Sequence, residues 1–353
     1  MKDYSKRMKQ KMNIYDIAME AGVSPATVSR VVNGNKNVKD ETRKKVLKII
    51  EEKKYVPNSL ARNLSVGDSQ NIAFLAPDIE NPFFSKIFHG LLDTANQYGY
   101  NVFMYGTNDD LLTEHRILDE IKKEMIKGIV IIPISDKDKG TAERLEKIQK
   151  NQIPVVLLDR DICQSDFDGV FSTDYEGACE GVQCLIRAGH KKIAIITGEL
   201  DTRPGRERFR GYKKALKDAD IKQRTEYIVN GMFKEAESYD ACKRLMEIDD
   251  RPTAIFTSSN LTTLGCLKYL KKNNLKIGRD ISLVCFDEIR ELQYSDICLT
   301  VVDRPIYEMG CAALELLEYN FLMENKMKNE RIVKKTNLLK TKLIVRGSEK
   351  YVV

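Results

Sequence analysis

Charged side chains stand at three places in the sequence where a buried strand is expected to end. They follow short apolar runs or open the next helix, and they are Asp159, Arg160, Arg208 and Asp287. Carboxylate and guanidinium groups each offer two aligned hydrogen-bonding partners, which suits a pair of neighbouring hydroxyls. The pattern predicts a binding site for a small polyhydroxylated molecule, with ordinary surface ion pairs as the alternative.

The loop after the first expected strand carries residues that suit the same chemistry. It reads Pro77-Asp78-Ile79-Glu80-Asn81-Pro82-Phe83-Phe84. The ring of Phe83 or Phe84 can cover the C–H face of a sugar, and Asp78 or Asn81 can hydrogen-bond its hydroxyls. The loop lacks the glycine pattern of a dinucleotide site. The alternative is that both rings are core residues at the start of a helix.

A different chemistry is indicated near the N-terminus. Apolar residues recur at helical spacing over 14–21, and Gly22 can end that helix. Ser24 and Pro25 suit the cap and the first position of a second helix. Its outward face is expected to carry Ala26, Thr27, Ser29, Arg30 and Asn33. This predicts a helix-turn-helix whose second helix can enter a DNA major groove, with two adjacent core helices as the alternative.

The basic residues gather in the same part of the chain. Residues 1–65 hold 15 Lys and Arg against 7 Asp and Glu, a net charge of +8, whereas the other residues sum to −2. This asymmetry predicts a polyanionic partner for the N-terminal part alone. Residues 1–12 are expected to form a basic arm.

From Asn71 onward, short apolar runs alternate with longer segments of helical pattern. The alternation predicts strands joined by helical crossovers, and therefore parallel sheets covered by helices on both faces. The runs form two series, of which the second begins near residue 169. We expect an α/β body with two doubly wound parallel sheets, in which ligands bind at the carboxyl ends of the strands.

Composition disfavours several other classes of protein. The chain has 353 residues, of which 42% are hydrophobic and 31% charged, and no apolar run is long enough to span a bilayer. The charged N-terminus lacks the apolar core of a secretory signal. Eight cysteines without a Cys-x-x-Cys pair and three scattered histidines predict reduced thiols and no metal site. The expectation is a cytoplasmic protein without a cofactor or a membrane partner.

The order of residues adds a resemblance to a known family. The segments that carry it are Tyr15-Asp16-Ile17-Ala18, Ala21-Gly22-Val23-Ser24, Thr27-Val28-Ser29-Arg30-Val31-Val32-Asn33, Tyr55-Val56-Pro57-Asn58, Ala61-Arg62 and Leu64. They closely resemble the DNA-binding head of the lactose-repressor/galactose-repressor family of bacterial transcription regulators. The resemblance continues to the C-terminus.

The resemblance implies a dimeric repressor that binds double-stranded palindromic operator DNA. It implies a helix-turn-helix head at 13–57, a hinge helix and linker at 58–69 and a body at 70–353. In the hinge, Leu64 would wedge into a minor-groove base step. The residues expected to contact DNA are Tyr15, Ser24, Pro25, Ala26, Thr27, Ser29, Arg30, Asn33, Asn37, Asn58, Ala61, Arg62 and Leu64.

For the body, the resemblance implies the two-lobed fold of periplasmic sugar-binding proteins, with a small carbohydrate-like effector between the lobes. We expect one lobe to comprise about 70–167 and 303–330, and the other about 168–302 and 331–353. The residues expected to bind the effector are Asp78, Asn81, Phe83, Phe84, Asp159, Arg160, Arg208, Ser259, Asn260, Asp287 and Arg304.

Two positions depart from the family pattern. Ser259-Asn260 stands where an Asn-Asp pair is frequent, and Asp303-Arg304 stands where a pair containing Gln usually precedes the proline. With Arg304, three arginines in the cleft would outnumber two carboxylates. This predicts a net positive pocket and an anionic effector, either a sugar phosphate or a sugar acid. If Asp159 and Asp287 pair with Arg304 instead, the site still suits a neutral polyol.

Two other functions stay open. A catabolite-control regulator has a similar head, and in that type a phosphorylated carrier protein sets the affinity for DNA. A doubly wound enzyme is the remote alternative, because the sequence shows no nucleophile–base pair, metal cluster or phosphate loop.

Overall fold

The computed structural model describes residues 13–32, 37–53, 55, 69–121, 124–294, 297–326 and 334–350. The chain divides into two compact units, Met1–Ser69 and Gln70–Val353. The expected basic arm and hinge, including Asn58, Ala61, Arg62 and Leu64, lie outside the described residues, as does Asn33.

Three helices make up the described part of the first unit: α1 (Ile14–Ala21), α2 (Pro25–Val32) and α3 (Asp40–Glu52). Asn13 caps the start of α1, and Gly22 ends it in the left-handed conformation, with φ of +68°. The hydroxyl of Ser24 accepts a hydrogen bond from the backbone N–H of Thr27 at 3.2 Å. The predicted end of α1 and start of α2 are confirmed, and one apolar core joins the three helices.

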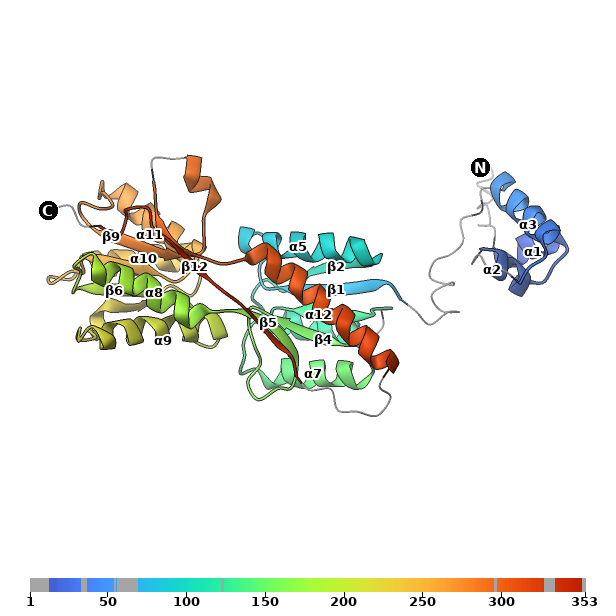
Figure 1. Cartoon of the computed structure of the whole chain (residues 1–353), viewed down its shortest axis with the longest axis horizontal. Coiled ribbons are helices and arrows are strands. Elements are labelled where there is room, and N and C mark those ends of the chain that lie inside the picture. The colour runs from blue at the N-terminus through green and yellow to red at the C-terminus, as the bar shows by residue number, and fades with distance from the viewer. Residues whose placement is uncertain are drawn as a thin grey trace, which may run out of the picture. The chain divides into compact units, whose positions relative to one another are not determined.

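The first sheet of the body is parallel, with the strand order β11-β5-β4-β3-β1-β2. Its strands are β1 (Asn71–Ala76), β2 (Asn101–Gly106), β3 (Gly128–Ile131), β4 (Val155–Leu158), β5 (Asp168–Ser172) and β11 (Thr336–Leu339). Helices α5 (Pro82–Tyr98) and α12 (Ile306–Lys326) pack on one face. Helices α6 (Leu111–Ile121) and α7 (Lys139–Lys150) pack on the other. Figure 1 shows α5 and α7 on opposite sides of this sheet.

The second sheet has the order β12-β10-β9-β8-β6-β7, in which only the β10–β12 pair is antiparallel. Its strands are β6 (Ile193–Thr197), β7 (Ile228–Asn230), β8 (Ala254–Thr257), β9 (Ser282–Phe286), β10 (Thr300–Asp303) and β12 (Lys342–Ile344). Helices α8 (Asp174–Arg187) and α9 (Arg203–Asp218) cover one face, and α10 (Glu235–Met246) and α11 (Asn260–Lys272) cover the other. Two short 3-10 helices, η1 (Thr225–Tyr227) and η2 (Arg290–Tyr294), complete this lobe.

The predicted α/β architecture with two doubly wound sheets is confirmed. The inner strands are buried along nearly their whole length, because helices cover both faces of each sheet. This double burial explains why their sequences are continuous apolar runs rather than alternating patterns.

The expected division between the lobes is wrong at two strands. β5 pairs with β4, and β11 pairs with β5, so both belong to the first lobe although they were expected in the second. The sequence of a short strand does not show which sheet edge is open to pair with it. In its described part the chain therefore crosses between the lobes three times, near Thr173, Arg304 and Thr341. The hydroxyls of Thr173 and Thr341 hydrogen-bond at 3.0 Å.

Candidate functional site

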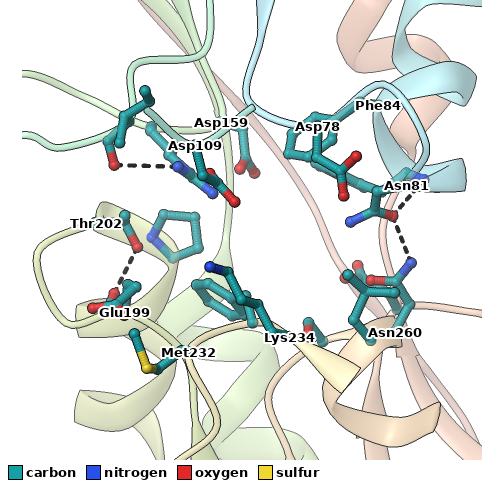
Figure 2. Close-up of a pocket in the computed structure, with 18 of the residues that line it drawn as sticks. Asp78, Asn81, Phe84, Asp109, Asp159, Glu199, Thr202, Met232, Lys234 and Asn260 are labelled. Atoms are coloured by element: carbon teal, nitrogen blue, oxygen red, sulfur yellow. Dashed lines mark hydrogen bonds between the residues drawn. The ribbon is translucent and has the colours of Figure 1, made fainter. Parts of the chain in front are cut away.

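A cavity of about 580 Å³ lies between the two lobes of the body. Its walls come from the loops at the carboxyl ends of strands in both sheets, as expected for doubly wound folds. In Figure 2, Asp78, Asp109 and Asp159 approach it from the first lobe, and Glu199, Lys234 and Asn260 approach it from the second. All the residues expected to bind an effector line this cavity: Asp78, Asn81, Phe83, Phe84, Asp159, Arg160, Arg208, Ser259, Asn260, Asp287 and Arg304.

The loop at the start of α5 joins the two lobes across the cavity. The side-chain oxygen of Asn81 accepts hydrogen bonds from the backbone N–H of Phe83 at 3.0 Å and from Nδ2 of Asn260 at 2.8 Å (Figure 2). Phe83 and Phe84 meet edge to face, with ring centroids 5.0 Å apart, and both belong to the core of the first lobe. The two interpretations of Phe83 and Phe84, as core residues and as ligand-facing rings, are compatible, because each ring packs in the core and also lines the cavity.

Arg304 lies at the floor of the cavity and is only 3% exposed. Its Nε and Nη2 donate to the two carboxylate oxygens of Asp287 at 2.6 and 3.0 Å, and its Nη1 donates to Oδ1 of Asp159 at 2.6 Å. The guanidinium carbon lies 4.3 Å from the centre of the Phe83 ring. Burial lowers the pKa of Arg304, but Asp287 and Asp159 more than offset this and raise it above its ordinary value.

Arg208 is also neutralised inside the protein. Its Nε donates to Oδ1 of Asp174 at 2.8 Å, and its Nη1 donates to the backbone oxygen of Ser258 at 2.5 Å. Its guanidinium carbon stands 3.9 Å from the centre of the Phe286 ring, within the range of a cation–π contact. Arg208 therefore continues the buried charge network, and its Nη1 lies 4.0 Å from Asp287.

Arg160 is held by carbonyl groups rather than by a carboxylate. Its Nη1 donates to the backbone oxygens of Pro133 and Ile134 at 3.4 and 3.2 Å. The backbone N–H of Ile134 in turn donates to the buried Glu114 at 3.1 Å. Burial raises the pKa of Glu114, while its hydrogen bonds with Thr141 and Ile134 oppose that change. Glu114 thus positions the loop that holds Arg160.

The expectation of a net positive pocket is wrong. Among the described residues that line the cavity, seven are acidic and four are basic. The acidic residues are Asp78, Asp109, Asp159, Glu199, Asp201, Glu235 and Asp287, and the basic residues are Arg160, Arg208, Lys234 and Arg304. The prediction counted carboxylates only at the strand ends that the sequence singled out, and it omitted those of the other loops and of Asp174. The internal pairing of Arg304, stated as the alternative, is the observed arrangement.

Ser259 has a local structural role that explains its presence. Its hydroxyl accepts from the backbone N–H of Thr262 at 3.1 Å and caps α11. Asp109, Glu199 and the segment 232–235 also line the cavity but were not predicted from the sequence. Asp174, which was not predicted either, lies behind the cavity floor and bonds to Arg208. All of them follow strand ends, so the signal that identified Asp159 and Asp287 also applied to them.

The head presents the second group of predicted residues. Tyr15 is 68% exposed, and Ala26, Arg30 and Asn37 are also exposed. Thr27 and Ser29 are half-buried, while Ser24 and Pro25 form the start of α2. Because Val28 and Val31 face the core, the polar side of α2 is left outward, which is the arrangement a recognition helix needs.

Two features are absent from the part of the chain that the structure describes. No helix there is long and apolar enough to cross a membrane. Nor does any group of three or more His, Cys, Asp or Glu side chains in that part of the chain suit a metal ion.

Comparison with known proteins matches both units of the chain. Residues 13–58 match the family described as "Bacterial regulatory proteins, lacI family". Residues 69–341 match "Periplasmic binding proteins and sugar binding domain of LacI family". These two matches take in the head and nearly the whole body.

Individual proteins give the same result. Catabolite control protein A of Priestia megaterium is 35% identical over 308 residues, which cover 87% of this chain and 91% of that protein. The HTH-type transcriptional repressor PurR of Aliivibrio fischeri (strain MJ11) is 31% identical over 306 residues, covering 86% and 90%. The crystal structure of the lac repressor dimer bound to operator and the anti-inducer ONPF has a TM-score of 0.81 at 23% identity, covering 97% and 100%, which is a likeness of fold.

Proposed function

Because the chain belongs to the LacI family of bacterial regulatory proteins, we propose that it represses genes of carbohydrate metabolism as a homodimer on a palindromic operator. It is a DNA-binding transcriptional regulator and not an enzyme. Since its operator is DNA in the bacterial cytoplasm, that is where we expect it to act. The proposal has two further parts, namely the face that reads DNA and the molecule that sets its affinity.

The head is proposed to read DNA through the outward side of α2. Arg30 supplies the guanidinium that can bond a guanine edge, and Thr27 and Ser29 lie on the same helix. Lys44 and Lys45, exposed on α3, suit phosphate contacts. The predicted contacts from Asn33 and from the hinge residues stay predictions, as does the wedge role of Leu64.

The effector is proposed to be a neutral, sugar-like polyol. The observation that carries this is a cavity of about 580 Å³ between the lobes whose buried arginines are already hydrogen-bonded within the protein. An anionic ligand would find acidic residues in excess and no arginine free of an internal partner among the described lining. Carboxylates and amides around an aromatic wall suit hydroxyl groups instead.

Calorimetry on the full-length protein tests the effector proposal. Glucose and ribose are compared with glucose 6-phosphate and ribose 5-phosphate, and operator affinity is measured with and without each compound. We expect a neutral sugar to bind and to change operator affinity, with its phosphate binding more weakly. Tighter binding of the phosphates would overturn the neutral-effector proposal.

One observation favours a second candidate function. The 35% identical relative over most of the chain is named Catabolite control protein A. The alternative is therefore a catabolite-control regulator whose operator affinity is set by a phosphorylated carrier protein. Titrating that carrier, phosphorylated and unphosphorylated, into the operator-binding assay separates the two: a response to the phosphorylated form alone, with no response to sugars, supports the alternative.

A further inference from the structure

Asp159 and Asp287 occupy equivalent positions in the two lobes. β4 lies between β3 and β5 in one sheet, and β9 lies between β8 and β10 in the other. Each aspartate directly follows its strand and donates its backbone N–H to the next strand, Asp159 to Val170 and Asp287 to Val302, both at 2.9 Å. The fold therefore places one carboxylate from each lobe at matching points of the cavity floor.

Both aspartates have a backbone conformation that is uncommon for residues other than glycine. Their φ angles are +62° for Asp159 and +72° for Asp287. Strained conformations of this kind persist where the surroundings hold them in place, and they cluster at functional sites. Here the shared conformation turns both carboxylates toward one guanidinium group, that of Arg304.

Arg304 stands where the chain crosses from the second lobe to the first, between β10 and α12. Its three nitrogens each donate to a carboxylate oxygen, two to Asp287 and one to Asp159. The rings of Phe83 and Phe286 lie 4.3 and 5.7 Å from its guanidinium carbon. Carboxylates in a fork and aromatic faces are the surroundings that select a planar guanidinium over a compact ammonium.

This contact, in which cation and carboxylates are all buried, differs from the ion pairs that Arg203 and Arg206 make across the lobes. There the arginines are 27–30% exposed, although Asp136, which also meets Arg206, is itself buried. Asp161 of the first lobe meets Arg203 and Arg206 of the second at 3.3 Å, but those side chains are about a quarter exposed. Asp159, Asp287 and Arg304 are all nearly inaccessible to solvent. Removing Arg304 would leave the charges of two buried carboxylates without their main cation. At the partly exposed pairs, water can solvate the charge that is left when one partner is removed.

We propose that the floor of the cavity is a guanidinium-binding site, formed by Asp159 and Asp287, which the chain fills with its own Arg304 so that the two lobes are tied together without an effector. This contact between the lobes persists whichever small molecule binds in the outer part of the cavity. An effector then contacts the groups above the floor, among them Asp78, Asp109 and Lys234, and does not displace the carboxylates from Arg304.

The test empties the site and refills it. Arg304→Ala in the full-length protein removes the part of the side chain that ethylguanidinium reproduces. The melting temperature of the variant should fall by several degrees, and millimolar ethylguanidinium should restore most of the loss. Calorimetry should show one ethylguanidinium bound per variant chain and none bound to the wild-type protein, a readout that a merely structural role of Arg304 would not produce.

Three controls make the result specific. Ethylammonium and potassium chloride at equal ionic strength should not restore stability. Arg346→Ala removes an arginine that pairs with a single carboxylate, Glu288, at a partly exposed place, and should show no such rescue. Failure of ethylguanidinium to bind Arg304→Ala, or equal rescue by ethylammonium, overturns the proposal.

If the alanine variant does not fold, the Arg304→Lys variant tests the same proposal by hydrogen exchange. A single ammonium cannot reproduce the three bonds, so the backbone amides of Asp159 and Asp287 should exchange with solvent faster than in the wild-type protein. Amides of the edge strands β2 and β7 should be unchanged. Wild-type exchange rates at both aspartates in Arg304→Lys would contradict the proposed tie.

Discussion

Arg30 in the head and Arg304 in the cleft show two opposite uses of the same side chain. Arg30 is exposed on the outward side of α2, where its charge stays in water. Arg304 is 3% exposed and bonds to two aspartates from different lobes. The guanidinium group of the head is therefore accessible to an external partner, whereas the guanidinium group at the cavity floor is hydrogen-bonded within the protein.

The difference follows from the cost of removing charge from water. A buried guanidinium is strongly destabilising unless hydrogen-bond acceptors, above all carboxylates, surround it, so a binding site built on buried charges must supply the partners itself. An exposed guanidinium is solvated by water and needs no partner within the protein, so it is available to bind a guanine or a phosphate. Mutations at the two places should therefore affect different properties, stability in the cleft and DNA affinity in the head.

The largest effect is expected at the cleft. Arg304→Gln leaves Asp159 and Asp287 buried without their main cation and should lower the free energy of unfolding by about 3–5 kcal/mol. Urea denaturation followed by circular dichroism measures it. Arg210→Gln is the matched control, because Arg210 is 61% exposed and its ion pair is with Glu207, one turn earlier in α9. Equal stability of Arg304→Gln and the wild-type protein would show that the floor network contributes nothing.

The next effect is expected in DNA binding. Arg30→Ala should weaken operator binding by about 1–3 kcal/mol and relax base preference, while stability stays unchanged. Fluorescence anisotropy with the operator and with single-base variants measures both quantities. Wild-type affinity and selectivity in Arg30→Ala would remove Arg30 from the recognition surface.

A third change separates folding of the head from recognition. Asn13 accepts from the backbone N–H groups of Tyr15 and Asp16, and Asp16 accepts from the N–H of Asn13 in return. Asn13→Ala should destabilise the head by about 1 kcal/mol through loss of this cap. Its base preference should remain that of the wild type at temperatures where the head is folded. A change in base preference would show that Asn13 also affects recognition, and that folding of the head and recognition of DNA are not separate.

The smallest effect is expected from a single exposed lysine of α3. Lys44→Ala should weaken binding to all DNA sequences alike and reduce the slope of log affinity against log salt by about 1. Titrations at several salt concentrations, with operator and with unrelated DNA, measure it. A sequence-dependent loss would place Lys44 at a base edge instead of a phosphate.

Local chemistry explains what could be predicted from the sequence. The cap at Ser24, the stop at Gly22 and the valines that bury one side of α2 are all properties of neighbouring residues. Continuous apolar runs between amphipathic helices likewise indicate a sheet covered on both faces. Residues at strand ends could be placed near a cavity because parallel strands bring their carboxyl ends to one edge.

Tertiary structure decided how those elements and charges are partnered. The sequence does not show that β5 and β11 join the first sheet, because a short strand can pair with any open edge of suitable register. Nor does it show that the neighbour Asp303 fails to neutralise Arg304 while Asp159, from the other lobe and 145 positions away in the chain, does so. Compensation of a buried charge depends on distance in space, which is set only once both lobes have folded. The sequence determined the class of protein and its candidate residues, and the folded arrangement of the lobes determined that the cavity floor pairs its own charges.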